Sequence, residues 1–418
     1  FAGHMQRIRR TISLLAVLPL FAISSAGGAD DPLSIQNDML KVSFDEGKFA
    51  ITDLKSGTSF AVATLEGVSG AAKAEKAKDK IFGKGQAISV SCANGGGKIM
   101  LFPGLPFVLV KVSVGNTGTG TKVLNKIPVA SISVDLGKPL VSLKGFGTGG
   151  ITKLEDNKGS YMWQAIVDPH SRNGVVGGWI TTERGSGVVF AGLTNNQAKM
   201  VAQVEYGRLR IAPKKTEELE TFVVGYFADA RLGMEAWADA VAKVLDIKLP
   251  PLPTVYCTWY HAGSSDENKL PVQAEFAAMN LAPFGFSVVQ IDDGWQDGQT
   301  KNGPRKNFTQ VRPGGPYKSG MKATAGKIRA LGLVPGIWLM PFSGSHEDPW
   351  YKERQNWFAR RDDGTPHESR WGGTALDMTN PEVLKYLKDE ISRIVNEWGY
   401  GYLKWTASVP GLRSTIAM

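Results

Sequence analysis

The sequence predicts a multidomain protein in which an all-β domain precedes an α/β domain. Short alternating apolar runs, broken by Gly, Asn, Asp and Pro, fill the chain from about Leu33 to Phe227 and are typical of an antiparallel β-sandwich. Beyond Pro253 predicted strands alternate with predicted helices, which is typical of a parallel sheet. Three prolines between residues 250 and 253 separate the two patterns. With 418 residues, the chain is long enough for two or three domains with cores of their own.

The composition excludes several classes of protein. A content of 42% hydrophobic and 21% charged residues argues against a wholly disordered chain. Two distant cysteines, Cys92 and Cys257, exclude a disulfide framework and a cysteine-built zinc site. The five histidines show no metal-ligand spacing, so we expect neither a metal nor an organic cofactor. No apolar run reaches the roughly 18 to 20 residues needed to cross a bilayer, so we expect no membrane span.

The first 29 residues have the layout of a secretory signal peptide. Residues 1–4 precede Met5 and are interpreted as a cloning remnant. Three arginines between positions 7 and 10, an apolar core over 12–23 and small residues over 24–29 predict cleavage near Ala29 and a secreted or periplasmic protein. A buried helix is the alternative. Removing the three arginines, with no acid, lowers the net charge from +9 to +6. Because the remaining basic residues are scattered, we expect no nucleic-acid partner.

The sandwich is predicted to span residues 30–227. Its clearest strand patterns lie at residues 41–44, 107–114, 130–134, 187–193 and 222–226. Residues 68–80 are rich in Ala, Lys and Gly, and we expect them to form a solvated loop or a hairpin tip.

Residues 228–252 are predicted to form a linker that contains one amphipathic helix. The helix is expected over Leu232 to Leu245, where the apolar stripe consists of Met234, Trp237, Ala238, Val241, Val244 and Leu245. The prolines that follow end the helix.

Residues 253–418 predict an incomplete (β/α)8 barrel. Strands are expected at 254–260, 287–291, 334–340 and 400–405, with helices at 270–281, 322–331 and 381–398. Thr379 and Asn380 are predicted to cap the last helix, with Pro381 in its first turn. A Rossmann-like sheet is the alternative, but no Gly-x-Gly-x-x-Gly follows any strand. A full barrel takes about 250 residues, so only about four βα units are expected.

Barrels bind ligands at the carboxyl ends of their strands, and the residues there have sugar-binding chemistry. They are Trp259 and His261, Asp292-Asp293-Gly294-Trp295, Trp338, and Lys404-Trp405. Adjacent carboxylates accept hydrogen bonds from vicinal hydroxyls, an indole face packs on the C–H face of a sugar, and an ammonium donates to hydroxyls. We therefore predict a pyranose subsite. A solvated turn or a cation site is the alternative for the paired acids, and core packing for the two tryptophans.

Four motifs give the chain a family resemblance. Taken in order and rough spacing, they resemble glycoside hydrolase family 36, which contains α-galactosidases, α-N-acetylgalactosaminidases and raffinose/stachyose synthase-like proteins and is related to family 27. The motifs are residues 256–260 (YCTWY), 290–296 (QIDDGWQ), 332–338 (GLVPGIW) and 402–405 (YLKW), and 376–381 (LDMTNP) also fits. The resemblance covers roughly residues 220–406. More loosely, the preceding domain resembles the family's N-terminal β-supersandwich.

The resemblance implies a retaining hydrolase of terminal α-galactosides that uses double displacement. In this chemistry one carboxylate attacks the anomeric carbon and a second carboxyl protonates the leaving oxygen. Asp292 and Asp293 match the pair that binds galactose hydroxyls, Trp259 and Trp338 match pocket aromatics, and Lys404 matches the strand-four lysine. The implied partner is an α-galactoside oligosaccharide or glycan.

Neither catalytic carboxyl group is found where the resemblance implies it. The nucleophile belongs two residues after Lys404, where this chain has Thr406, and the acid/base belongs to a later strand beyond Met418. A threonine hydroxyl is not ionised at neutral pH and needs an activating base. We therefore expect no intact catalytic residue and an impaired activity in the chain as written.

Residues 406–418 resemble nothing in the family, and the genetic code suggests a reason. Restoring one G after the Trp405 codon converts TGG ACG GCC TCN into TGG GAC GGC CTC, which encodes Trp-Asp-Gly-Leu. Our hypothesis is a one-base deletion followed by out-of-frame residues. A pseudoenzyme with a shortened barrel is the alternative. Half a barrel leaves two unpaired edge strands, so we expect the chain to be poorly soluble.

Two further functions stay open at this point. One is an α-N-acetylgalactosaminidase or a raffinose/stachyose synthase-like transglycosidase on the same scaffold. The other is a non-catalytic carbohydrate-binding protein, which a genuine Thr406 favours. The sequence does not determine the oligomeric state.

Overall fold

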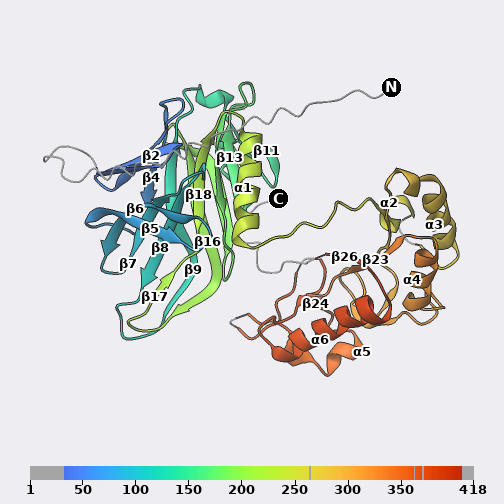
Figure 1. Cartoon of the computed structure of the whole chain (residues 1–418). Helices are drawn as coiled ribbons and strands as arrows, with labels where there is room; N and C mark the ends of the chain where they lie inside the picture. Colours follow the sequence, from blue (N-terminus) through green and yellow to red (C-terminus); the bar gives the residue numbers. More distant parts are fainter. Residues whose placement is uncertain (1–32, 263–264, 362, 370, 407–418) are drawn as a thin grey trace, which may run out of the picture.

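The computed structural model describes residues 33–406 apart from 263–264, 362 and 370 (Figure 1). The predicted signal peptide and the hypothetical out-of-frame residues 407–418 lie outside the described residues, as do residues 1–4. Within the described ranges, no helix is both long and apolar enough to cross a bilayer.

The first half of the chain is a sandwich of two antiparallel sheets, as predicted. The first sheet has the order β1-β2-β3-β4-β9-β16-β15-β12, and the second has the order β11-β10-β13-β14-β18-β8-β7-β6-β5, with β17 also paired to β8. The bounds are β1 Leu33–Gln36, β2 Leu40–Asp45, β3 Lys48–Asp53, β4 Ser59–Leu65, β5 Ala72–Asp79, β6 Gly83–Cys92, β7 Gly95–Leu101, β8 Val108–Gly115, β9 Lys122–Val134, β10 Lys144–Gly147, β11 Gly150–Lys153, β12 Lys158–Tyr161, β13 Trp163–Val167, β14 Gly174–Trp179, β15 Ser186–Thr194, β16 Gln197–Ile211, β17 Thr216–Glu218 and β18 Phe222–Phe227.

The core of the sandwich comes from the alternating apolar residues of both sheets. Val42, Ile51, Val110, Ile132 and Phe222 are all completely buried in one cluster. Alternate residues of a strand point to opposite faces, so this period-two pattern places one apolar face of each sheet against the other.

The prediction of a loop over residues 68–80 is wrong in its centre. Residues 72–79 form β5, the edge strand of the second sheet, paired with β6 from Ala72↔Val90 to Asp79↔Gly83. Alanines alternate with lysines and acids along this strand, so it lacks the large apolar residues from which a strand is usually recognised. Charged side chains, especially lysine, are common on exposed edge strands because they oppose pairing with other chains.

Helix α1 (Ala230–Val244) lies along the second sheet of the sandwich, over β14 and β18 (Figure 1). The Asp229 side chain caps it by accepting a hydrogen bond from the Arg231 N–H. The predicted stripe is partly wrong, because Ala238 and Leu245 are exposed and Gly233 is buried instead. A Cβ at Gly233 would lie 2.4 Å from the Phe227 ring, so glycine allows the close approach of helix and sheet.

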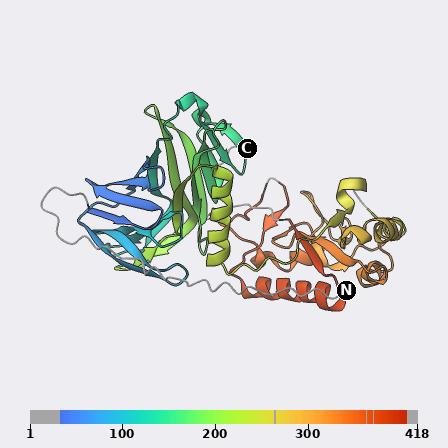
Figure 2. The same cartoon turned by 45° about the horizontal axis from the view of Figure 1, so that its top comes forward.

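The second half contains a four-stranded parallel sheet in the order β19-β20-β23-β26, which confirms the predicted partial barrel. Its strands are β19 Val255–Cys257, β20 Val288–Ile291, β23 Val334–Leu339 and β26 Tyr402–Trp405. The helices between them are α2 Thr258–Ala262, α3 Lys269–Asn280, α4 Met321–Ala330, α5 Pro349–Lys352 and α6 Pro381–Ser392. Figure 2 shows α6 running beside the parallel strands. The buried cluster between sheet and helices includes Val289, Ile337, Ala274, Ile328 and Ile394.

Two predicted boundaries in this half differ from the structure. The first strand ends at Cys257 rather than at residue 260, because Thr258 already begins α2. Trp259 and His261 therefore lie on a short helix and not on a strand. The helix predicted over 381–398 consists of α6 and a π-helical turn over Arg393–Glu397. The Asn380 cap is confirmed, because its side chain accepts a hydrogen bond from the Glu382 N–H at 2.9 Å.

Short elements that the sequence did not predict lie beside the strand ends. They are β21 Gln296–Asp297, β22 Asn307–Val311, β24 Ser343–Gly344 and β25 Thr374–Ala375. The last two pair with each other in the long connection from β23 to α6. An aromatic cluster of Tyr351, Trp357, Phe358 and Tyr386 packs this connection against α6.

Candidate functional site

Asp292 is the centre of a polar cluster at the carboxyl end of the parallel sheet. It follows β20 directly, and its Oδ2 accepts hydrogen bonds from Lys404 Nζ at 2.8 Å, Gln290 Nε2 at 3.0 Å and the Cys257 thiol at 3.2 Å. These donors come from β26, β20 and β19, so the cluster joins three of the four strands. Only 7% of the Asp292 side chain is exposed. The structure therefore brings Asp292 and Lys404 together, as their positions at neighbouring strand ends suggested.

The charges of this pair stabilise each other. Burial raises the pKa of Asp292, but the hydrogen bonds, led by the one from Lys404, outweigh it and hold the pKa below the ordinary 3.8. Burial lowers the pKa of Lys404, yet the contact with Asp292 keeps it above the ordinary 10.5. Burial also raises the pKa of the Cys257 thiol, and its bond to Asp292 adds to the effect. At neutral pH the site thus holds a carboxylate, an ammonium and a protonated thiol.

Asp293 is held by a separate network. Its Oδ1 accepts a hydrogen bond at 2.6 Å from Gln296 Nε2, which also donates to the Arg305 carbonyl at 2.9 Å. Its own N–H donates to Asp292 Oδ1 at 2.9 Å, so the two carboxylates are oriented relative to each other. Asp293 is half-buried, whereas Asp292 is buried. Asp293 is therefore the more accessible acceptor for a hydroxyl.

The loop that carries Gln296 is anchored by a lysine that the sequence analysis missed. Lys306 is completely buried, and its Nζ donates to the carbonyls of Asn302 at 3.1 Å and Pro304 at 2.6 Å. Burial lowers its pKa to about 8. A lysine inside a hairpin loop gives no sequence signal of burial, because lysines in such loops are usually exposed.

The two predicted tryptophans have different positions from those expected. Trp338 is buried and packs edge-on against Phe308, so core packing describes its ring. Its indole N–H donates to Thr406 Oγ1 at 2.7 Å, which links it to the position where the resemblance implies the nucleophile. Trp259 is half exposed on α2. Tyr260 is the aromatic residue beside the cluster, with its ring centroid 4.9 Å from Lys404 Nζ, a cation–π distance.

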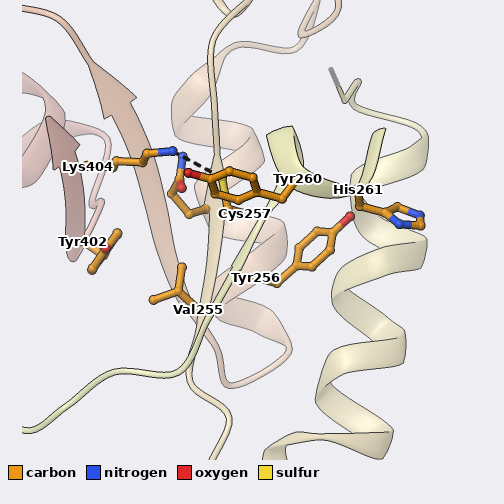
Figure 3. Close-up of a pocket in the computed structure, with 8 residues that line it drawn as sticks. Val255, Tyr256, Cys257, Tyr260, His261, Tyr402 and Lys404 are labelled. Carbon is orange, nitrogen blue, oxygen red and sulfur yellow. Dashed lines mark hydrogen bonds between the residues drawn. The ribbon is translucent and has the colours of Figure 1, made fainter. Parts of the chain in front are cut away.

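A cavity of about 490 Å³ adjoins the cluster on the inner face of the sheet (Figure 3). Lys404 lines it together with Val255, Tyr256, Cys257, Tyr260, His261, Gln290 and Tyr402. Gly336 keeps this face open, because a Cβ there would lie 2.9 Å from Gln290 Cβ and 3.0 Å from Tyr402 Cδ1. The alternation of Tyr402 with Lys404 and of Gln290 with Asp292 was a sequence signal for these missed lining residues.

The alternative of a cation site at the paired acids is not supported at Asp292. The ammonium of Lys404 already neutralises this carboxylate at 2.8 Å. Across the described part of the chain, no group of three or more His, Cys, Asp and Glu side chains is arranged to hold a metal ion.

Comparison with known families places this site. Residues 255–409 match the family model described as Melibiase, and all five predicted site residues lie inside the match. This segment is a Melibiase domain. The match covers β19 to β26, so it contains every strand of the parallel sheet.

Solved structures match both halves of the chain. A family 36 α-galactosidase, AgaA of Geobacillus stearothermophilus, in complex with 1-deoxygalactonojirimycin has a TM-score of 0.61 at 13% identity, covering 90% of this chain and 65% of that one. The α-galactosidase of Lactobacillus brevis has a TM-score of 0.59 at 14% identity, covering 89% and 63%. An AgaA variant in complex with raffinose has a TM-score of 0.62 at 13% identity, covering 90% and 65%.

These likenesses, together with the Melibiase match, confirm the predicted resemblance to family 36 and the predicted fold class. The fold is a β-sandwich followed by a partial barrel, and the chain spans about two thirds of the length of the solved structures. The binding roles of Trp259, Asp292, Asp293, Trp338 and Lys404 stay predictions.

Proposed function

We propose that the protein acts on terminal α-galactosides as a glycoside hydrolase, with the polar cluster of the Melibiase domain as its sugar-binding site. The observation that carries this proposal is the charged Asp292–Lys404 pair, with Asp293 beside it, at the carboxyl end of the parallel sheet. Raffinose, present in one of the matching crystal structures, is an α-galactoside oligosaccharide. We therefore propose an oligosaccharide of this class as the partner.

The cluster divides into groups that accept and groups that donate hydrogen bonds. Asp293 accepts from one sugar hydroxyl and Asp292 from its neighbour, since vicinal hydroxyls match two adjacent carboxylates. Lys404 donates, and its link to Asp292 fixes its direction. In retaining hydrolysis a carboxylate then attacks the anomeric carbon while the leaving oxygen takes a proton from a second carboxyl.

Position 406 determines whether this chemistry runs. Thr406 Oγ1 accepts a hydrogen bond from Trp338 Nε1, and no carboxylate or imidazole contact of this hydroxyl is recorded among the described residues. An unactivated hydroxyl is a poor nucleophile at neutral pH. We therefore propose that this chain binds α-galactosides and hydrolyses them slowly.

Binding and turnover are tested separately. Calorimetric titration of the full chain with methyl α-galactoside is expected to show binding that Asp293→Asn weakens at least tenfold, because it removes a carboxylate acceptor. Asp389→Asn, at an exposed aspartate of α6, is the matched control and is expected to bind as the unmodified chain does. Absence of binding by the unmodified chain would overturn the proposal.

Turnover is measured with an aryl α-galactoside, whose leaving group needs little protonation. The unmodified chain is expected to release little phenol, and Thr406→Asp to release more, because it supplies a carboxylate two residues after Lys404. Thr406→Asn is the isosteric control without a charge. If sugar binds and Thr406→Asp stays inactive, the second candidate is favoured: a carbohydrate-binding protein without catalysis, to which the observed Thr406 already points.

We also propose that the protein is exported, on the basis of residues 5–29. Expression with the complete leader is expected to place the chain outside the cytoplasm with a new N-terminus near Asp30. Edman sequencing of the fractionated protein measures this. A cytoplasmic chain that still begins at or before Met5 would contradict export.

A further inference from the structure

A second cavity, of about 380 Å³, lies in the sandwich and is separate in sequence from the Melibiase domain. It is formed where β10, β11, β12 and β13 meet, near the labels β11 and β13 in Figure 1. Glycines of the 147–150 turn form one wall, and Ser160, Tyr161 and Gln164 form another. Its volume falls within the range of roughly 300 to 1,000 Å³ that is common for small-molecule sites.

Gln164 is the feature that suggests a ligand. Its side chain is only 2% exposed, and Oε1 is buried without a hydrogen-bond partner. Buried acceptors are nearly always paired, because leaving one unpaired costs free energy. An unpaired carbonyl oxygen in the wall of a cavity is a position where a bound molecule can donate a hydrogen bond.

The local backbone explains how this group comes to face the cavity. Tyr161 pairs with Val188 in the first sheet, and Trp163 pairs with Gly178 in the second. The chain therefore passes between the sheets at Met162, whose φ of 66° is uncommon for a residue with a side chain. This crossing brings Ser160 and Gln164 to the same space. A Cβ at Gly147 would lie 2.4 Å from Ser160 Oγ and 3.4 Å from Gln164 Cγ, so a larger residue there would fill the space between them.

The chemistry of the walls indicates an uncharged, hydroxyl-bearing ligand. The lining residues include no carboxylate, and Lys158 at the exposed rim is the single ionisable amine among them. Ser160 Oγ already accepts the Thr148 N–H at 2.9 Å and lies 3.1 Å from Thr148 Oγ1, which leaves Gln164 Oε1 as the unsatisfied group. The glycine wall presents flat Cα–H surface on which the C–H face of a ring can lie.

We propose that this cavity binds the ring of a neutral sugar, with one ring hydroxyl donating to Gln164 Oε1. The site is independent of the proposed hydrolase function, because it shares no residue with the polar cluster of the Melibiase domain. It adds a carbohydrate-binding site to the sandwich domain, for which no role follows from the barrel chemistry.

The test uses the full chain and three probes, namely methyl α-galactoside, glucose and sucrose, detected by saturation-transfer NMR and calorimetry. An Asp292→Asn/Asp293→Asn variant serves as the background, so that binding at the barrel is removed. In this background at least one probe is expected to bind. Gly149→Phe is expected to weaken that binding at least tenfold by filling the cavity, and Gln164→Leu by removing the acceptor.

The controls separate the cavity from general effects on folding. Gly149 lines the cavity, and a Cβ there meets nothing within 4 Å, so the substitution fits the fold. Gly120 also has nothing within 4 Å and lies outside the cavity, so Gly120→Phe is expected to bind like the background variant. No binding of any probe in the background variant overturns the proposal and indicates that the cavity holds water only. Unchanged binding in both Gly149→Phe and Gln164→Leu, or an equal loss in Gly120→Phe, overturns it as well. Failure of the hydrolase proposal would leave these results unaffected.

Discussion

Replacing Lys404 by methionine tests the central contact of the site. The substitution keeps most of the apolar stem and removes the ammonium that donates to Asp292 Oδ2 at 2.8 Å. A hydrogen bond to a charged group contributes about 1.5 to 3 kcal/mol. Removing one partner of a fully buried ion pair costs about 3 to 5 kcal/mol, because a bare charge stays behind.

The structure places the expected loss below that range. The Lys404 side chain is 26% exposed, so solvent already weakens the contact. Gln290 and Cys257 also continue to donate to Asp292 in the variant. We therefore expect Lys404→Met to lower the free energy of unfolding by about 2 kcal/mol at pH 7.

The sign of the pH dependence follows from Asp292. In the folded chain its pKa lies below 3.8, so the pairing stabilises the fold above that pH and is lost as the pH falls through the folded-state value. In the variant, burial without the ammonium raises the pKa, and the carboxylate destabilises the fold above pH 3.8. The difference between the two proteins is therefore expected to shrink as the pH falls below 3.8.

Urea unfolding followed by tryptophan fluorescence measures this, because eight of the eleven tryptophans lie between residues 259 and 405. Lys385→Met is the control, since the Lys385–Asp389 pair is exposed, and we expect a loss under about 0.5 kcal/mol. Adding Asp292→Asn to Lys404→Met is expected to restore about 1 kcal/mol by removing the bare charge. A Lys404→Met chain as stable as the unmodified one at pH 7, or a loss that is equal at pH 3 and pH 7, would refute the reasoning.

Three further substitutions test the packing around the site, each by the same unfolding measurement. Gly336→Ala is expected to cost about 1 to 3 kcal/mol by overpacking against Gln290, whereas Gly326→Ala, in α4 with nothing within 4 Å of the added Cβ, is expected to stabilise by about 1 kcal/mol. Burial raises the pKa of Glu390 from 4.5 to about 7, so its contribution to stability falls as the pH rises from 4.5 to 7; Glu390→Gln is expected to remove that part of the pH dependence, and an unchanged slope contradicts it. Asn380→Ala is expected to cost about 1 kcal/mol through loss of the α6 cap, and a neutral result contradicts the cap.

The sequence was sufficient for the sheets and for the ion pair because both follow from periodicity and strand order. Asp292 and Lys404 each follow or end a parallel strand, and the carboxyl ends of such strands share one edge. The position of Trp259 could not be predicted in this way. It depends on where β19 gives way to α2, and strand boundaries are set by tertiary contacts such as the hydrogen bond from the Asp292 N–H to Thr258 Oγ1.

Residues that act from behind the site were also missed. Cys257 was dismissed as a lone cysteine, although its thiol donates to Asp292 in the folded chain. The connection over residues 341–380 has no clear period, because its order comes from aromatic packing of Trp350, Tyr351 and Trp357 rather than from regular strands. Lys306 reads as a surface lysine until the fold encloses it.

The structure separates the groups proposed for sugar binding from the position that determines turnover. The binding cluster is anchored through Asp292 to β19, β20 and β26, whereas Thr406 is anchored to β23, with its N–H on the Leu339 carbonyl at 2.9 Å and its Oγ1 on the Trp338 N–H. A change at residue 406 therefore leaves the three donors of Asp292 in place. A carboxylate at 406 could accept the same indole N–H that Thr406 accepts now. Binding without turnover and binding with turnover thus differ by one side chain in this scaffold, which is why Thr406→Asp, measured for both properties, distinguishes a hydrolase from a carbohydrate-binding protein.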